Sequence, residues 1–479
     1  MNYVKLAAVS LNQTPLDWSG NSSRLREAIA ECRNAGAELI CLPELAITGY
    51  GCEDQFLAPS TCDQALNRLA RLLPETRDLV VAVGLPLQHQ NAVYNVVALI
   101  SDGRLLGFYA KQNLAGDGIH YEQRWFRAWP TGQVARIDIL GETVPLGDVT
   151  FEVGGRRIGF EACEDAWVAN RPGRNYSKVG IDIILNPSAS HFAFGKHRIR
   201  EQFACEGSRA FGAAYVYANL LGNESGRVIF DGGSLIASGG ELLAGAPRLS
   251  FKDIEIITAT VNLDLNRLNQ ARTMSREVDP LATCTVTTPH TWTGCAPGND
   301  IGPAPELSKE EEFTLAVCLG LFDYMRKSHS NGFIVSLSGG ADSAAVASLV
   351  FLMHHLAVEE LSEETFLSRL PQFKGAINMS DLLLCAYQAT KNSGEVTRNA
   401  AAKLAEALGA DYAEWDVQPA VDHYIQLAES TAGRTLNWED DDITLQNIQA
   451  RVRAPGIWMQ ANLRNALLLS TSNRSEAAV

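Results

Sequence analysis

The sequence predicts an α/β protein built from two structural units. Short β-rich runs alternate with helix-length segments up to about residue 260, which is the pattern of a layered α/β fold. A stretch rich in Thr, Pro and Gly follows, and beyond it a buried strand leads directly into a glycine-rich turn and a new helix. The chain has 479 residues, too many for one compact core. We therefore expect at least two domains.

The predicted strands of the first unit are short β-rich runs. They cover residues 5–11, 39–42, 79–85, 95–100, 157–160, 181–185 and 213–218. A polar-capped segment at 22–35 has the spacing of a helix. We expect helix-length connections and no tight hairpins between these strands. The segment 231–245 is the exception, because its Gly239-Gly240 pair predicts a hairpin turn.

The second unit begins after a predicted linker at residues 285–307, which is rich in Thr, Pro and Gly and has no periodicity. Ser308 and Glu311 have the spacing of a capping box and predict a helix that extends to about Lys327. A buried strand at 333–337 follows. The predicted domains are residues 1–284 and 308–479.

The composition excludes several classes of protein. With 40 basic and 55 acidic residues the formal net charge is −15, so the chain lacks the basic surface that nucleic acids require and is a poor match for anionic membranes. No segment has the length of a signal-peptide core or about 18 uninterrupted apolar residues. The ten cysteines contain no C-x-x-C pair, which predicts reduced thiols, no zinc site and a cytoplasmic location.

Three polar residues stand where predicted strands of the first unit end: Glu44, Lys111 and Cys163. Strand ends are where α/β folds place their chemistry. A cysteine that attacks an amide needs a base for its proton and a positive group for the oxyanion that forms. A carboxylate and a lysine ammonium supply these two functions, and the backbone N–H of Glu164 is a further candidate donor.

The segments around these residues, LPELAITGYGCED, YAKQNL…HYEQRWF and GFEACEDAW, resemble the three signature regions of the nitrilase superfamily. That resemblance covers about 270 residues and implies an α/β/β/α sandwich that hydrolyses carbon–nitrogen bonds through a thioester. It implies that Glu44 is the general base, Lys111 the oxyanion-stabilising cation and Cys163 the nucleophile. Glu122, eleven residues after the lysine, matches a second acidic residue that orients the site.

The same resemblance suggests groups that bind glutamine. NPSASHFAFGK is similar to the serine-bearing loop of the superfamily, which suggests Ser190 and Glu164 as substrate contacts. Lys196 stands where relatives that use glutamine often have an arginine for the substrate carboxylate, although a lysine does not form the bidentate fork. Many relatives have a proline and a tyrosine after the catalytic lysine, whereas this chain has AGDGIH. An aromatic wall for the pocket must therefore come from elsewhere or be absent.

The glycine-rich turn of the second unit, Ser338-Gly339-Gly340-Ala341-Asp342-Ser343, lies between a strand and a helix. Two glycines let backbone N–H groups converge on an anion, and the positive end of the helix dipole adds to the attraction. The hydroxyls of Ser338 and Ser343 are further donors. Asp342 would repel a phosphate, so its useful role is to hold Mg²⁺. No G-K-[ST] follows, so this is not a Walker A loop.

This turn resembles the pyrophosphate-binding loop of the ATP pyrophosphatase family, whose doubly wound parallel sheet binds a nucleotide. Within that family, NIQARVR and LLLSTSNRSEAAV look like NAD synthetases. The resemblance implies that Thr471 contacts an ATP phosphate, that Glu476 is a second Mg²⁺ ligand and that Arg451 lies near the dinucleotide. NSGEVT, at residues 392–397, lies where the family contacts ATP. The family carries further binding residues beyond SEAAV, so we expect the sequence to be truncated there.

Together the resemblances imply a ligase that amidates nicotinate adenine dinucleotide to NAD with ATP and glutamine. They also imply a homo-oligomer and a protected passage for ammonia between the two sites. Two alternatives stay open. One is another amidoligase that adenylates a different carboxylate with the same two modules. The other is a nucleotide-binding regulatory protein whose nitrilase-like domain is inert.

Overall fold

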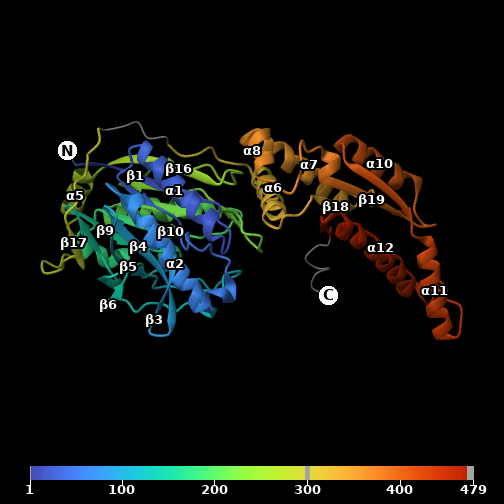
Figure 1. Cartoon of the computed structure of the whole chain (residues 1–479), viewed down its shortest axis with the longest axis horizontal. Helices are drawn as coiled ribbons and strands as arrows, with labels where there is room; N and C mark the ends of the chain where they lie inside the picture. The colour runs from blue at the N-terminus through green and yellow to red at the C-terminus, as the bar shows by residue number, and fades with distance from the viewer. Residues whose placement is uncertain (1, 297–301, 472–479) are drawn as a thin grey trace. The chain divides into compact units, whose positions relative to one another are not determined.

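The computed structural model describes residues 2–296 and 302–471. By its internal contacts the chain divides into two compact units, Met1–Ala316 and Val317–Val479. Figure 1 traces the chain from blue at the N-terminus to red at the C-terminus. Both units are mixed α/β structures, as the alternation of strand and helix patterns predicts.

The first unit contains two large sheets. The eight-stranded sheet has the order β16-β1-β2-β3-β4-β5-β7-β6 and the seven-stranded sheet the order β15-β14-β11-β10-β9-β8-β17. The first consists of β1 (Tyr3–Leu11), β2 (Leu39–Cys41), β3 (Val80–His89), β4 (Ala92–Ser101), β5 (Arg104–Ala110), β6 (Val134–Ile139), β7 (Glu142–Gly147) and β16 (Ile254–Asn262). The second consists of β8 (Phe151–Val153), β9 (Arg156–Phe160), β10 (Ile183–Ser188), β11 (Ala214–Asn219), β14 (Leu235–Ser238), β15 (Glu241–Gly245) and β17 (Val286–Thr288).

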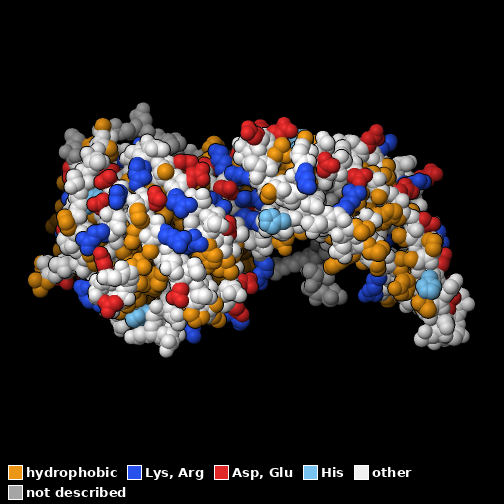
Figure 2. Space-filling view, in the orientation of Figure 1, with side chains coloured by type: hydrophobic (Ala, Val, Ile, Leu, Met, Phe, Trp, Pro, Cys, Tyr) orange, Lys and Arg blue, Asp and Glu red, His pale blue; other side chains and the backbone are white. Residues whose placement is uncertain are grey.

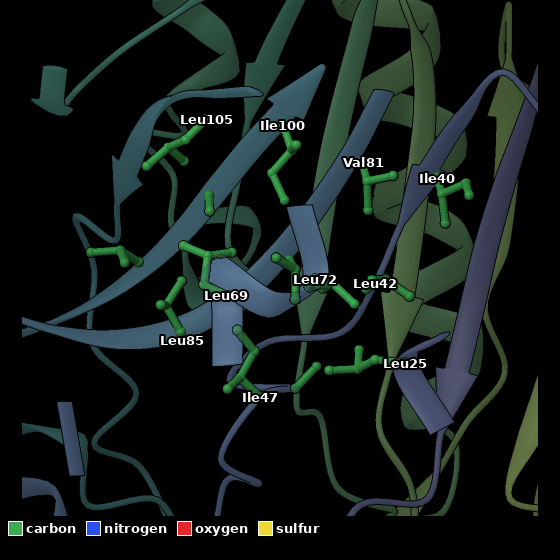
Figure 3. Close-up of a cluster of buried hydrophobic side chains, with 14 of the residues drawn as sticks. Leu25, Ile40, Leu42, Ile47, Leu69, Leu72, Val81, Leu85, Ile100 and Leu105 are labelled. Atoms are coloured by element: carbon green, nitrogen blue, oxygen red, sulfur yellow. The ribbon is translucent and has the colours of Figure 1, made fainter. Parts of the chain in front are cut away.

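The two sheets pack face to face with helices outside, because the strands are apolar on both faces. Side chains from β1 to β4 meet side chains from β9, β10 and β11 in one buried core between the sheets. Helices α1 (Trp18–Asn34) and α2 (Pro59–Leu72) cover the other face of the first sheet through the cluster in Figure 3. Helices α3 (Gly173–Val179) and α4 (Lys196–Phe211) cover the second sheet. This is the predicted α/β/β/α sandwich.

Several connections differ from the prediction. The expectation of no tight hairpins among the predicted strands was wrong, since β3 and β4 are joined by the two residues Gln90 and Asn91, both at positive φ. Asp102 and Gly103 make a similar turn between β4 and β5. Asp followed by glycine favours the second turn, and Asn91 in the first belongs to a residue type that tolerates positive φ. The predicted turn at Gly239-Gly240 joins β14 to β15.

The segment predicted to be a linker, 285–307, contributes to the first unit in its described part. Val286–Thr288 forms β17, which pairs in parallel with β8. Trp292 donates a hydrogen bond from its indole N–H to the carbonyl of Val153 at 3.0 Å, and the Arg156 guanidinium lies 4.1 Å from the centre of its ring. Residues 297–301 lie outside the described part of the chain.

The second unit has a four-stranded parallel sheet in the order β20-β19-β18-β21. Its strands are β18 (Phe333–Ser336), β19 (Leu383–Ala389), β20 (Asp411–Asp416) and β21 (Leu467–Leu469). Helices α7 (Ala341–Leu361) and α10 (Glu395–Leu408) contact these strands, and α12 (Asp442–Arg464) covers the face that carries Ile334 and Leu384. The unit also contains α8 (Glu363–Ser368), α9 (Met379–Leu382) and α11 (Gln418–Ala432). Helices on both faces of a parallel sheet are the predicted doubly wound arrangement.

The capping box at the start of α6 (Lys309–Lys327) forms as predicted. The Ser308 hydroxyl accepts from the Glu311 N–H at 3.2 Å, and the Glu311 carboxylate accepts from the Ser308 N–H at 2.8 Å. The helix ends at the predicted residue, Lys327.

Helix α7 has the length and apolar composition that would suffice to cross a membrane. This is weak evidence, because the core helix of a folded domain passes the same test. Its buried residues Ser343, Ala347, Val350 and Ala357 recur every three to seven positions, and the helix contacts β18, β19 and α10. That spacing indicates one face packed on the sheet.

Candidate active sites

The three residues of the predicted triad come from both sheets of the first unit. Glu44 follows β2, and Lys111 directly follows β5 in the same sheet. Cys163 follows β9 of the other sheet and begins the short 3₁₀ helix η4 (Cys163–Ala166). All three side chains are buried. The triad therefore lies where the ends of both sheets meet.

Lys111 is the centre of this cluster. Its ammonium donates to Glu44 Oε1 at 2.6 Å and to Glu122 Oε1 at 2.9 Å. The Asn95 side-chain amide donates to the same Glu44 oxygen at 2.7 Å. The second oxygen of Glu44 is buried and has no hydrogen-bond partner among the described residues. One carboxylate oxygen is thus fixed by two donors, and the other remains available to accept a proton.

The electrostatics of the cluster suit a general base. Burial raises the pKa of Glu44 above its usual range despite the Lys111 charge, which makes this carboxylate a stronger base. Burial alone would lower the pKa of Lys111, but the carboxylates of Glu122 and Glu44 raise it well above its ordinary value. Burial, together with the charge of Glu44, raises the pKa of the Cys163 thiol to about 12. Cys163 is therefore a thiol at rest and needs a base when it attacks.

A strained turn presents Cys163. Its φ is +46°, in the left-handed region that non-glycine residues rarely adopt, and such outliers concentrate at functional sites. Asp165 anchors the turn by accepting from the Ala162 N–H at 3.1 Å and the Asn113 N–H at 2.8 Å. It also accepts from the Tyr109 hydroxyl at 2.8 Å. Burial nevertheless raises the pKa of Asp165 to about 7. Asp165 thus ties the nucleophile turn to the loop after Lys111.

The residues predicted to bind glutamine lie at the nucleophile end of the second sheet. Glu164 is in η4, Ser190 follows β10 and is buried, and Lys196 begins α4. The Ser190 N–H donates to the Asn219 side chain at 2.8 Å. Glu164 and Cys163 both act on the pKa of Lys196, which places all three within electrostatic range of one another. The structure thus brings this predicted set to the triad.

A buried ion network supports the Ser190 loop. Arg200 on α4 is fully buried and pairs with Asp231 at 2.6 Å. Its guanidinium also donates to the carbonyl of His191 at 2.7 Å. Arg248 lies 3.6 Å from Asp231 and pairs with Glu312 on α6. Arg200 thus holds the backbone carbonyls of Ser190 and His191, while Asp231 and Arg248 extend the network behind it.

Sequence reasoning missed several groups around the triad, notably Tyr50, Asn95, His120 and His191. Tyr50 donates its hydroxyl proton to Glu122 at 2.7 Å, and the ring of Trp167 lies 5.5 Å from the Lys196 ammonium. These two rings supply aromatic surface that the loop after Lys111 lacks. The signal for Tyr50 was its place six residues after Glu44 within the first signature segment. His120 and His191 also stand within quoted segments, HYEQRWF and NPSASHFAFGK, but nothing in those segments shows that the fold brings the two rings together. Asn95 carries no local pattern.

The glycine-rich turn of the second unit joins β18 to α7 as predicted. Gly339 has a φ of +79°, and a Cβ there would lie 2.3 Å from the carbonyl oxygen of Thr397. Ser343 is buried, accepts from the Ser338 N–H at 3.2 Å and donates to the Gly340 carbonyl at 3.1 Å. Asp342 is exposed in the first turn of α7. The turn is thus preformed and requires glycine at one position at least.

A cavity of about 290 Å³ opens beside this turn. Residues of the predicted NSGEVT contact line it together with Ser338, Gln388 and Arg453. Gln388 is held by the Ser336 hydroxyl at 3.0 Å and donates to the Arg453 carbonyl at 2.7 Å. Arg453 belongs to the NIQARVR segment, but sequence reasoning singled out Arg451 instead.

The other predicted residues of the second unit are Thr471, Arg451 and Glu476, and neither Thr471 nor Arg451 lines the cavity beside the glycine-rich turn. Thr471 is exposed two residues after β21, at the same sheet edge as the turn after β18. Arg451 is exposed on α12 and lines a separate, more apolar cavity of about 860 Å³ between α11 and α12. Glu476 lies outside the described residues. In the described part of the chain, no group of three His, Cys, Asp or Glu side chains is arranged to hold a metal ion.

The fold and the buried Glu–Lys–Cys cluster define a carbon–nitrogen hydrolase of the nitrilase type. The carbon-nitrogen hydrolase family model matches residues 5–273, and the NAD synthase family model matches residues 313–479. The chain belongs to the glutamine-dependent NAD(+) synthetase family, which is a family of carbon–nitrogen ligases. This membership decides against the other amidoligases that the sequence left open.

Three relatives illustrate the similarity. The chain is 30% identical to a glutamine-dependent NAD(+) synthetase of Rattus norvegicus, over 99% of this chain and 71% of that protein. A crystal structure of a glutamine-dependent NAD(+) synthetase from Cytophaga hutchinsonii is 41% identical, has a TM-score of 0.85 and is matched over 100% of this chain and 76% of its own. The structure of a glutamine-dependent NAD+ synthetase from Acinetobacter baumannii in complex with ADP is 23% identical and has a TM-score of 0.76. The match covers 99% of this chain and 76% of that chain and shows similarity of fold alone.

Proposed function

We propose that the first unit hydrolyses glutamine at Cys163 and that the second unit uses the ammonia to amidate nicotinate adenine dinucleotide at the expense of ATP. The observation that carries this proposal is the fully buried cluster of Lys111 with two carboxylates beside the strained Cys163. An inert domain would have no reason to keep three charges out of water, because burying them is costly. The cluster therefore also argues against a purely regulatory role.

Glutamine hydrolysis follows from the geometry of the first site. As the Cys163 sulfur attacks the side-chain amide carbon, the free oxygen of Glu44 takes the thiol proton. The oxyanion forms near the Lys111 ammonium and the Glu164 N–H, which stands at the start of η4 where the helix offers it no acceptor. Glu44 then gives the proton to the amide nitrogen. The carbon–nitrogen bond breaks, ammonia departs, and the glutamyl group remains on Cys163 as a thioester. Water then attacks the thioester with Glu44 again as base, which releases glutamate and restores the thiol.

The second site is suited to hold the phosphates of ATP. The backbone at Gly339 and Gly340 and the N-terminal end of α7 favour an anion, and the hydroxyl of Ser338 lines the adjoining cavity. In the proposed reaction the nicotinate carboxylate displaces pyrophosphate from ATP to form an adenylate. Ammonia then attacks the adenylated carbonyl carbon, so that the amide of NAD forms and AMP leaves.

Magnesium is the proposed metal of this site. Asp342 is exposed beside the phosphate turn and would hold the ion together with Glu476, which is outside the described residues, and the phosphates themselves. When bound, such an ion neutralises phosphate charge. If Asp342→Asn still releases pyrophosphate at the normal rate and with unchanged Mg²⁺ dependence, this metal assignment is wrong.

Association into a homo-oligomer and a protected path for ammonia complete the proposal. Large apolar side chains are exposed on α11 and α12, and Figure 2 shows hydrophobic side chains gathered around α11. These are Tyr424, Leu427, Ile443, Trp458, Met459 and Leu463. Exposed apolar surface of this kind marks protein interfaces. Free ammonia is mostly protonated in water at neutral pH, so a protected path would preserve the nucleophile.

The direct test is to incubate the chain with glutamine, ATP, Mg²⁺ and nicotinate adenine dinucleotide and to measure NAD, AMP and glutamate. We expect all three products, and NAD but no glutamate when ammonium chloride replaces glutamine. Glutamate without NAD would support only the first half of the proposal. Absence of glutamate from a folded protein would overturn the role of Cys163.

A further inference from the structure

A continuous chain of side chains connects the triad to Lys196. The Tyr50 hydroxyl contacts Glu122 at 2.7 Å and His120 Nδ1 at 3.2 Å. His120 Nε2 lies 2.8 Å from His191 Nδ1. The Lys196 ammonium then lies 3.4 Å from His191 Nε2 and 3.2 Å from Nδ1. Neither histidine has a role in the hydrolysis described above.

The chemistry of the two ends fixes the direction of these hydrogen bonds. Glu122 as a carboxylate only accepts, so the Tyr50 hydroxyl must donate to it and accept from His120 Nδ1–H. His120 Nε2 then carries the lone pair and accepts from His191 Nδ1–H. The lone pair that remains is on His191 Nε2, 3.4 Å from the Lys196 ammonium, which only donates; the ammonium also lies 3.2 Å from the protonated Nδ1, so it lies against both ring nitrogens. From His191 through His120 and Tyr50, every donor therefore points towards Glu122.

Both imidazoles are neutral in this arrangement, and their surroundings keep them so. Burial and the Lys196 charge lower the pKa of both His120 and His191 to about 4. A protonated His191 would have no lone pair for the ammonium and would repel it. The pair thus acts as a neutral acceptor that can hold a cation without cancelling its charge.

Lys196 is a half-buried cation that forms no ion pair with a carboxylate among the described residues. Its ammonium has the His191 ring on one side and the Trp167 ring at 5.5 Å on another. Glu164 and Cys163 are within its electrostatic range. A cation that is held by neutral groups near a nucleophile retains its capacity to bind an anionic group of the substrate.

His120 also connects this arrangement with solvent. It lines a cleft of about 500 Å³ on the surface of the first unit, together with Tyr121, Arg124 and Arg227. The other side of its ring contacts His191 and Tyr50. His120 therefore stands between an open cleft and the buried groups of the triad.

We propose that His120 and His191 are positioning residues that hold the Lys196 ammonium for the α-carboxylate of glutamine and thereby set the preference for the free amino acid. This inference rests on the proposed glutaminase function. The carboxylate would then meet a single ammonium that the His191 ring contacts through both of its nitrogens. An amide that lacks the α-carboxylate does not bind the Lys196 ammonium. Its affinity should therefore change little when the histidines are replaced.

The experiment compares His191→Phe, which removes both ring nitrogens, with His191→Gln, which retains one donor and one acceptor. Binding of L-glutamine and of L-glutamine α-amide is measured by calorimetry in the Cys163→Ala background, where no turnover occurs. KM and kcat for glutamate release are measured with Cys163 intact. Unfolding midpoints establish that each variant is folded.

We expect His191→Phe to weaken glutamine binding about tenfold, the effect of a hydrogen bond to a charged group, and to raise KM with little change in kcat. Binding of the α-amide should change about twofold or less, and His191→Gln should retain most of the affinity. His120→Phe should act in the same direction. In the Lys196→Met background His191→Phe should add little, because the two residues act through one interaction.

Equal weakening of both ligands, or a fall in kcat at unchanged KM, would overturn the proposal. So would additive effects of His191→Phe and Lys196→Met. Because binding is measured without turnover, these outcomes are separate from failure of the proposed hydrolysis, which would appear as absence of glutamate release by the unaltered chain.

Discussion

The two sites of this chain are built in opposite ways. The hydrolase site of the first unit is fully buried and contains its own charges, with Lys111 between Glu44 and Glu122. The phosphate turn of the second unit consists of backbone, hydroxyls and the exposed Asp342, and its geometry is fixed by glycine. The first site contains both its positive and its negative charges before the substrate binds. The second site depends on charge that the ligand supplies.

The difference follows from the charge of the two substrates. In the proposed reaction glutamine brings a neutral amide to Cys163, so the protein must supply the base and the cation itself, and buried charges are tolerated only when they are paired. ATP brings several negative charges, which need donors and a metal and no buried carboxylate. The first site should therefore fail when one side chain is removed, and the second when its backbone is distorted.

The largest expected effect is that of Cys163→Ala. Removal of the nucleophile should reduce glutamate release by about 10⁴-fold or more, since residues that act as a unit lose nearly all catalysis together. NAD formation from added ammonium should persist, because that chemistry belongs to the other unit. The half-buried Cys205 is the matched control, and Cys205→Ala should retain glutaminase activity. Loss of both activities in a folded Cys163→Ala protein would contradict the division of labour.

A backbone change should break the second site. Gly339→Ala forces a side chain into positive φ, which costs about 1–3 kcal/mol, and places its Cβ 2.3 Å from the Thr397 carbonyl oxygen. We expect ATP-dependent pyrophosphate release to fall about 100-fold or more while glutamate release persists. Gly340→Ala should lose much less, because φ there is −94° and the nearest atom, the Ser338 hydroxyl oxygen, is 3.3 Å away. Equal effects of the two variants would refute the steric explanation.

Ligands of the second site should change the rate of glutamine hydrolysis at the first. A hydrolase that is complete without substrate would waste glutamine unless the second site restrained it. We expect ATP and the acid dinucleotide together to raise glutamate release between about 5- and 150-fold, the range of ordinary coupling energies of 1–3 kcal/mol. Rates of glutamate release with and without these ligands provide the measurement. An unchanged rate would indicate two enzymes on one chain without communication.

The smallest predicted effect concerns pH. Burial and the neighbouring Arg200 lower the pKa of Lys196 to about 8, against the opposing charges of Cys163, Asp231 and Glu164. Lys196 loses its charge as pH rises, so KM for glutamine should increase above pH 8, by up to about tenfold per pH unit. Lys196→Arg stays charged and should lack this dependence. The same alkaline limb in both proteins would assign it to the substrate amine.

Much of the fold could be predicted because the signals were local. The runs at 5–11 and 333–337 are short and mainly apolar, and they form β1 and β18. The capping box at Ser308 depends on residues three apart and formed as expected. The turns at 90–91 and 102–103 were missed, although Asp102-Gly103 is itself a local hairpin signal. Strand β17 within the predicted linker depends on pairing with β8, 135 residues earlier, which no local pattern reveals.

The sequence by itself determined the residue types of both sites, because Glu44, Lys111, Cys163 and the glycine-rich turn stand in recognisable segments at strand ends. Only the tertiary structure decided how they work. Lys111 becomes a permanent cation because two sheets enclose it with Glu44 and Glu122. His120 and His191, 71 residues apart, become neighbours at 2.8 Å. Charge state and hydrogen-bond direction depend on burial and on partners distant in the chain, and these exist only once the sheets have packed.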